Sequence, residues 1–150
     1  MALEPLAGLR VVDLFAGSGA LGIEALSRGA VHVDFAERRG PTLAVLEGNL
    51  ERLGVRDRAR IWPIDLGRGL RPLRAAIAAA HLVLLDPPYH HGLAVAALDE
   101  LGGMELQPGV RVVAEHHAKE SMPERAGRLV RARSREYGET VVTTYADQES

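Results

Sequence analysis

An acid, two prolines and an aromatic residue follow a short apolar run in the middle of the chain. The sequence reads LVLL over residues 82–85 and continues as Asp86-Pro87-Pro88-Tyr89. Two successive prolines cannot continue a strand, because neither has an N–H for the ladder and both fix φ. The segment can therefore present a carboxylate, rigid carbonyls and an aromatic face, which accept hydrogen bonds and stack on a planar ligand. In the alternative interpretation, Asp86-Pro87 only caps the strand and Tyr89 lies in the core.

A glycine-rich segment near the N-terminus has the spacing of a cofactor-binding loop. Gly17, Gly19 and Gly22 match G-x-G-x-x-G after an apolar run, and Glu37 ends the next apolar run. Glycines at this spacing let an adenosine-containing cofactor approach the backbone. The carboxylate of Asp13, just before this loop, would repel a pyrophosphate at the following helix. We therefore favour a cationic cofactor, S-adenosylmethionine, over a nicotinamide dinucleotide.

Apolar runs alternate with helix-forming segments along the chain. The predicted strands span residues 10–15, 31–36, 60–64, 81–85 and 110–114. The predicted helices span residues 20–28, 41–53, 66–80 and 93–101. Pro72 must lie in the first turns of the third helix or break it. Two further strands, residues 129–137 and 140–145, predict an antiparallel hairpin that turns at Gly138-Glu139.

This alternation is typical of βαβ units in a mostly parallel sheet with helices on both faces. We expect an α/β, Rossmann-like fold with a C-terminal antiparallel hairpin, and residues 1–150 as a single domain. Ligands bind such sheets beyond the carboxyl ends of the strands, so we expect the acids found there to surround one site. These acids are Asp13, Glu37, Asp65, Asp86 and Glu115.

The composition limits the class of protein. The chain is 47% hydrophobic and 25% charged, with no cysteine and a net charge of −2, which is typical of a globular protein and excludes thiolate chemistry. The histidine pairs at residues 90–91 and 116–117 lack the spacing of metal ligands, so we expect no metal. Without a membrane-length apolar run or a signal-peptide pattern, we expect a cytoplasmic protein that does not enter the membrane.

The glycine loop resembles that of a known family. Residues 13–28, DLFAGSGALGIEALSR, are similar to the cofactor loop of class I methyltransferases, and especially to that of the bacterial 16S rRNA guanine-N2 methyltransferases known as the RsmD family. The segment at 86–89, with Gly92-Leu93 after it, resembles that family's catalytic motif. The resemblance extends from Leu9 to Tyr145. Its C-terminal signatures are Glu115, Lys119-Glu120, Pro123 and Tyr137-Gly138-Glu139-Thr140.

The resemblance implies S-adenosylmethionine-dependent methylation of N2 of a guanine in 16S rRNA. It implies that Glu37 holds the ribose hydroxyls of the cofactor and that Asp65 holds its adenine amine. The predicted catalytic residues are Asp86, Pro87, Pro88 and Tyr89. The predicted cofactor-binding residues are Asp13, Phe15, Ala16, Gly17, Ser18, Gly19, Glu37, Arg38, Asp65 and Leu66.

The acid-Pro-Pro-aromatic motif suits the methylation of an exocyclic amine. Such a nitrogen is a poor nucleophile because its lone pair is delocalised into the ring, so a site must hold its hydrogens and aim the nitrogen at the methyl group. Asp86 and a carbonyl of the Pro87-Pro88 turn can accept those hydrogens, and Tyr89 can stack on the base. A guanine within a duplex must be unstacked to reach such a pocket.

Other interpretations remain open from the residues alone. The same motif occurs in enzymes that methylate adenine N6 or a protein glutamine amide, and the chain could also be a non-catalytic S-adenosylmethionine-binding module or a nicotinamide oxidoreductase. The expected partner is 16S rRNA or a small-subunit assembly intermediate, and the expected state is a monomer. Family members usually carry a basic segment before the first strand, where about nine residues stand here. We therefore expect this chain to bind RNA weakly and mostly through charge.

Overall fold

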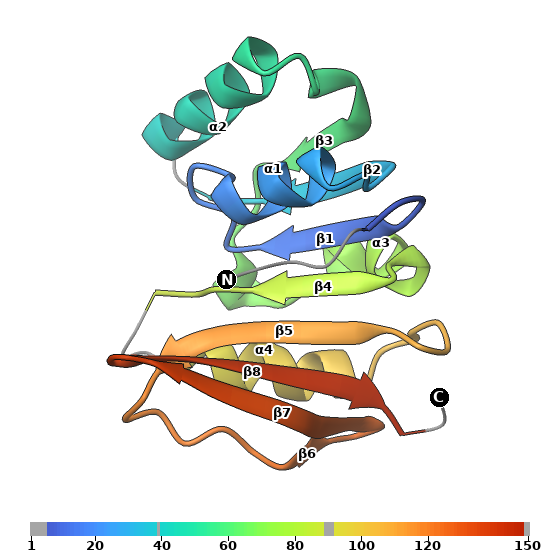
Figure 1. Cartoon of the computed structure of the whole chain (residues 1–150), viewed down its shortest axis with the longest axis vertical. Coiled ribbons are helices and arrows are strands. Elements are labelled where there is room, and N and C mark those ends of the chain that lie inside the picture. Colours follow the sequence, from blue (N-terminus) through green and yellow to red (C-terminus); the bar gives the residue numbers. More distant parts are fainter. Residues whose placement is uncertain (1–5, 39, 89–91, 149–150) are drawn as a thin grey trace.

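Eight strands form one sheet in the computed structural model, which describes residues 6–38, 40–88 and 92–148 (Figure 1). Five strands run parallel: β1 (Arg10–Leu14), β2 (His32–Ala36), β3 (Ala59–Trp62), β4 (Leu82–Leu85) and β5 (Arg111–His117). Three strands are antiparallel to their neighbours: β6 (Arg125–Ala126), β7 (Leu129–Tyr137) and β8 (Thr140–Asp147). The order across the sheet is β3-β2-β1-β4-β5-β8-β7-β6. The expected fold class is confirmed.

The order of the strands fixes where a ligand can bind. β1 lies beside β4, although β2 and β3 come between them along the chain. The chain therefore reverses its direction of travel across the sheet at this pair. In open α/β sheets a crevice forms at such a point, outside the carboxyl ends of the strands.

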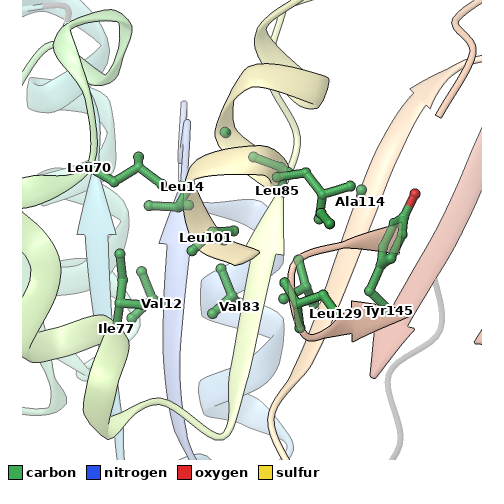
Figure 2. Packing of buried hydrophobic residues seen from close by; sticks show 14 of the residues in the cluster. Val12, Leu14, Leu70, Ile77, Val83, Leu85, Leu101, Ala114, Leu129 and Tyr145 are labelled. Carbon is green, nitrogen blue, oxygen red and sulfur yellow. The ribbon is translucent and has the colours of Figure 1, made fainter. Parts of the chain in front are cut away.

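Helices cover the sheet on both faces. They are α1 (Ala20–Ser27), α2 (Gly40–Arg52), α3 (Arg74–Ala79) and α4 (Leu93–Gly102). On one face Val11 and Leu84 share a buried cluster with Leu46 of α2. On the other face Val83 packs in a second cluster that contains Leu101 of α4 (Figure 2). Successive residues of a strand point to opposite faces, so each central strand contributes to both clusters. Among the helices of the described residues, none has the length and apolar character needed to cross a membrane.

Two predicted elements fall more than one residue short of their predicted bounds at one end. The helix predicted over residues 66–80 forms only as α3, after two 3-10 turns, η2 (Leu66–Arg68) and η3 (Arg71–Leu73). Gly69, with φ of +109°, and Pro72 in η3 prevent an earlier start. The strand predicted to reach residue 64 ends at Trp62, because Pro63 has no N–H to pair. The two-residue β6 was not predicted, whereas the hairpin turn at Gly138, with φ of +64°, is confirmed.

Candidate active site

Two adjoining cavities open at the carboxyl ends of β1 to β4. Each has a volume of about 450 Å³, which is within the range of ligand pockets. The first cavity is lined by predicted residues of β1, of the loop after it and of the turn after β4: Asp13, Phe15, Ala16, Gly17, Ser18, Asp86 and Pro87. The second is lined by predicted residues that follow β2 and β3: Arg38, Asp65 and Leu66. Three of the predicted residues line both cavities: Phe15, Glu37 and Pro88.

Some residues do not match the prediction. Gly19 lines neither cavity, and Tyr89 lies outside the described residues. Residues outside the predicted set of catalytic and cofactor-binding residues also line the cavities: Ala20, Leu21 and Thr42 in the first, and Ile64, Gly67, Arg68 and Leu93 in the second. Gly67 and Arg68 could have been found from their closeness to Asp65 in the sequence. Thr42 gives no such signal, since only the packing of α2 brings it to the site.

The loop after β1 has a conformation that suits glycine. Gly17 and Gly19 have φ of +58° and +88°, the left-handed region that favours glycine. Phe15 also has a positive φ, +60°, which an aromatic residue rarely adopts. The N–H of Gly19 donates to the carbonyl of Ala16 at 2.9 Å and closes the turn. The loop therefore holds Phe15 in a strained conformation at the border of both cavities, a feature that is common at ligand sites.

The third glycine of the motif allows α1 to approach β1 and β2. A Cβ atom at Gly22 would lie 2.3 Å from Cε1 of Phe35 and 2.9 Å from Oδ2 of Asp13. The N–H of Gly22 donates a hydrogen bond to the same Asp13 oxygen at 3.1 Å. Any larger residue at position 22 would therefore displace the helix from the Asp13 carboxylate.

Asp13 is an unusual acid, because it lines the first cavity and yet is only 1% exposed. Burial raises the pKa of Asp13 to about 7, against the opposing hydrogen bond from Gly22, and the carboxylates of Asp86 and Glu37 raise it further. A positive charge in the first cavity would favour the ionised form. The carboxylate expected at the mouth of the loop is thus present, but buried.

This burial predicts a particular pH dependence of stability. Because the pKa of Asp13 is raised on folding, the free energy of unfolding should decrease as the pH rises from about 4 to about 7, by up to about 4 kcal/mol from this residue. Asp13→Asn cannot ionise and should lose this part of the dependence. Urea denaturation at several pH values measures the free energy of unfolding, and the exposed Asp57→Asn serves as a control. If the free energy of unfolding changes with pH equally in Asp13→Asn and in the wild type, the expectation is contradicted.

Glu37 connects the loop after β1 to the end of β2. Its Oε2 accepts a hydrogen bond from the N–H of Gly17 at 2.8 Å, and its Oε1 accepts one from the N–H of Arg38 at 2.9 Å. A carboxylate has about four acceptor positions. Because Glu37 lines both cavities, this carboxylate lies where the hydroxyl groups of a ligand that extends across them could reach it.

Asp65 is held in its ionised form beside the second cavity. The N–H of Gly67 donates to its Oδ1 at 2.9 Å, and Arg38 lies 3.3 Å from its Oδ2. The Gly67 hydrogen bond is the main cause that lowers the pKa of Asp65, and Arg38 and Arg68 add to it. The site thus offers a charged acceptor to donors in the second cavity.

Asp86 lies directly after β4, between the first cavity and β5. Partial burial raises the pKa of Asp86 to about 6, and the carboxylate of Glu115 contributes to the increase. The parallel register pairs Leu85 with Ala114, which places Glu115 next to Asp86. Pro87 is buried and Pro88 is exposed. Asp86 is therefore followed directly by a rigid turn, and the pKa of its carboxyl group lies near the physiological range.

No group of three or more His, Cys, Asp or Glu side chains in the described part of the chain could hold a metal ion. His116 is buried and shares a hydrogen bond of 2.8 Å with the hydroxyl of Thr143. This contact gives the residue a structural role.

Comparison with known proteins identifies the family. The family model described as "Conserved hypothetical protein 95", which is the RsmD family, matches residues 1–146. The chain belongs to this family. The family is one of S-adenosylmethionine-dependent methyltransferases, so the cofactor is S-adenosylmethionine. The glycine loop, the two adjoining cavities and the acid that lines both of them fit a molecule of this size and charge.

Relatives of the chain carry names that agree with the RsmD family. "Putative rRNA methyltransferase YlbH" of Bacillus subtilis is 37% identical over 139 residues, which are 92% of this chain and 76% of that protein. Ribosomal RNA small subunit methyltransferase D of Buchnera aphidicola is 36% identical over 84 residues, which are 56% of this chain and 42% of that protein. A solved structure from Haemophilus influenzae, described as a "putative methylase", has a TM-score of 0.82 and 27% identity, and the match covers 95% of this chain and 88% of that one.

Proposed function

We propose that this chain is a single-domain enzyme that methylates N2 of a guanine in 16S rRNA, either free or in a small-subunit assembly intermediate. The observation that carries the proposal is the position of Asp86 and its Pro-Pro turn on the cavity that the glycine loop also lines. A methyl donor held by the loop would lie beside a group suited to hold an amine. The names of the two curated relatives support rRNA, and the second supports the small subunit.

The two cavities suggest how the cofactor lies. We assign its adenine to the second cavity, where Asp65 can accept hydrogen bonds from the amine, with Arg38 and Leu66 beside it. We assign its ribose to Glu37, because that residue lines both cavities. The methionine part then occupies the first cavity, where the Asp13 carboxylate attracts positive charge. Bound there, S-adenosylmethionine supplies a methyl group on a positively charged sulfur.

Asp86 and the turn after it hold the acceptor amine. The Asp86 carboxylate accepts a hydrogen bond from one amine hydrogen, and a carbonyl of the Pro87-Pro88 turn accepts the other, since proline has no N–H that would compete. These contacts aim the nitrogen at the methyl group. When the N–C bond forms and the C–S bond breaks, the amine loses a proton, which the carboxylate can take. We assign base stacking to Tyr89, as the sequence motif predicts.

The raised pKa of Asp86 predicts the pH profile of the reaction. Only the ionised carboxylate accepts both the hydrogen bond and the proton, so the rate of methyl transfer should fall as the pH decreases below about 6. Glu115→Gln removes the negative charge that raises this pKa and should move the profile to lower pH. Single-turnover rates between pH 5 and 8 at saturating cofactor test both statements. A profile that is unchanged in Glu115→Gln would contradict the assignment.

Mass spectrometry of the products tests the proposed substrate. Unmodified 16S rRNA is incubated with the protein and isotope-labelled S-adenosylmethionine, alongside assembly intermediates of the small subunit. The expected result is labelled N2-methylguanine at one position. Labelled N6-methyladenine, or label on a protein glutamine, would show that the acceptor is adenine or glutamine and not guanine. Tight cofactor binding without any transfer would indicate a non-catalytic module.

A further inference from the structure

The antiparallel half of the sheet leaves one face open. On the side of α4, Val112 and Ala114 of β5 are fully buried, whereas Val113, Glu115 and His117 on the other side are only partly buried. β8 alternates in the same way, and β7 is exposed from residue 131 onward. Figure 1 shows α4 behind these strands and α1 and α2 over the opposite half of the sheet. Within the described part of the chain, no helix covers this face. A parallel strand such as β5 is ordinarily covered on both sides.

The strand register places three rows of side chains on the open face. β7, β8 and β5 each contribute one residue to a row. The rows are Arg133–Thr144–Val113, Arg135–Val142–Glu115 and Tyr137–Thr140–His117. The middle row continues to Asp86, which stands next to Glu115 on the neighbouring strand. The open face is therefore continuous with the candidate active site, about 14 Å from β4 to β7.

The side chains at the far end of these rows suit an RNA strand. Arg133 and Arg135 are exposed, and no ion pair holds either of them within the described residues. On the opposite face, by contrast, Arg128 pairs with Asp147 and Arg131 with Glu124.

Tyr137 beside them is 54% exposed. Planar guanidinium groups bind phosphates in a bidentate manner, and an exposed aromatic ring stacks on bases. The combination fits a single-stranded polyanion with aromatic bases better than it fits a protein surface.

We propose that this open face binds the RNA strand that flanks the target nucleotide. Arg133 and Arg135 contact its phosphates, and Tyr137 stacks on a flanking base while the target nucleotide reaches Asp86. The inference rests on the proposed function, since it assigns the RNA path to the same site. A few nucleotides of extended RNA cover the distance from β7 to Asp86.

A double variant with a matched control tests the proposal. Arg133→Gln/Arg135→Gln is compared with Arg71→Gln/Arg74→Gln, which removes two exposed charges from η3 and α3, on the other face of the sheet. The KM for a 16S rRNA transcript should rise at least tenfold in the first variant, while kcat and the calorimetric affinity for S-adenosylmethionine stay within twofold. The slope of the logarithm of the RNA-binding constant against the logarithm of the salt concentration should become shallower by about 1.4 to 1.8, which corresponds to the loss of two phosphate contacts. The control should match the wild type.

Tyr137→Ala provides an independent measurement. It should weaken RNA binding by about tenfold without a change in the salt slope, because stacking releases no counterions. Wild-type RNA affinity in both open-face variants would overturn the inference and leave the proposed function intact. If the wild type methylates no rRNA, the proposed function fails, and the binding measurement still decides whether the face holds RNA. A dimer that dissociates in the double variant would assign the face to a second copy of the chain instead.

Discussion

Asp86→Ala should lower the rate of methyl transfer by about 100- to 1,000-fold while the affinity for S-adenosylmethionine stays within a few-fold. The size of the loss is that of removing one hydrogen-bonding group from a preorganised polar site. The affinity persists because the acceptor amine, and not the cofactor, is the proposed partner of this carboxylate. Removing a partly buried acid whose pKa is raised should also not destabilise the fold above pH 6.

Two further variants make this result specific. Asp86→Asn keeps the shape of the side chain and one acceptor oxygen but cannot take a proton, so its rate should lie between those of the wild type and Asp86→Ala. The exposed Asp57→Ala removes a carboxylate in the 3-10 turn η1 (Arg56–Arg58) that is distant from Asp86 in the sequence, and it should leave the rate unchanged. Single-turnover kinetics with 16S rRNA, together with calorimetric titration of the cofactor, measures both quantities. Near wild-type turnover in Asp86→Ala would show that Asp86 and its turn are only structural.

Glu37→Ala should weaken S-adenosylmethionine binding by about ten- to a hundredfold. Hydrogen bonds to a charged acceptor contribute about 1.5–3 kcal/mol, which corresponds to this range. The structure adds a second cause, because the same carboxylate accepts the N–H of Gly17 at 2.8 Å and so holds the loop in place. The overall fold should be retained, since Glu37 follows β2 and does not belong to either buried cluster.

The two causes can be separated. Glu37→Gln keeps one carbonyl acceptor for the Gly17 N–H but has no charge, so its cofactor affinity should fall less than that of Glu37→Ala. Glu51→Ala on the exposed side of α2 is the matched control and should bind like the wild type. Calorimetric titration gives the affinities, and circular dichroism checks the fold. Wild-type affinity for S-adenosylmethionine in Glu37→Ala would show that this residue does not bind the cofactor.

The sequence by itself determined the elements whose signals are local. The strand before the glycine loop, the loop itself at Gly17 and Gly19 and the hairpin turn at Gly138 follow from residue types within a few positions, because apolar periodicity and glycine spacing act over short stretches of chain. Local signals also placed acids at or near the carboxyl ends of the strands. The parallel arrangement then follows from the alternation of strands and helices, so the edge at which these acids meet could be predicted.

The tertiary structure alone decided the state of those acids. Asp13 has a raised pKa because α1 and Phe35 pack around it, and Glu115 affects Asp86 because the register of β4 and β5 places them side by side. The hydrogen bond from Gly17 to Glu37 joins residues that are 20 positions apart. Desolvation, charge coupling and such bonds depend on which distant segments come into contact. The same is true of the open face on β5, β8 and β7, since a strand pattern shows which residues alternate but not which side remains uncovered.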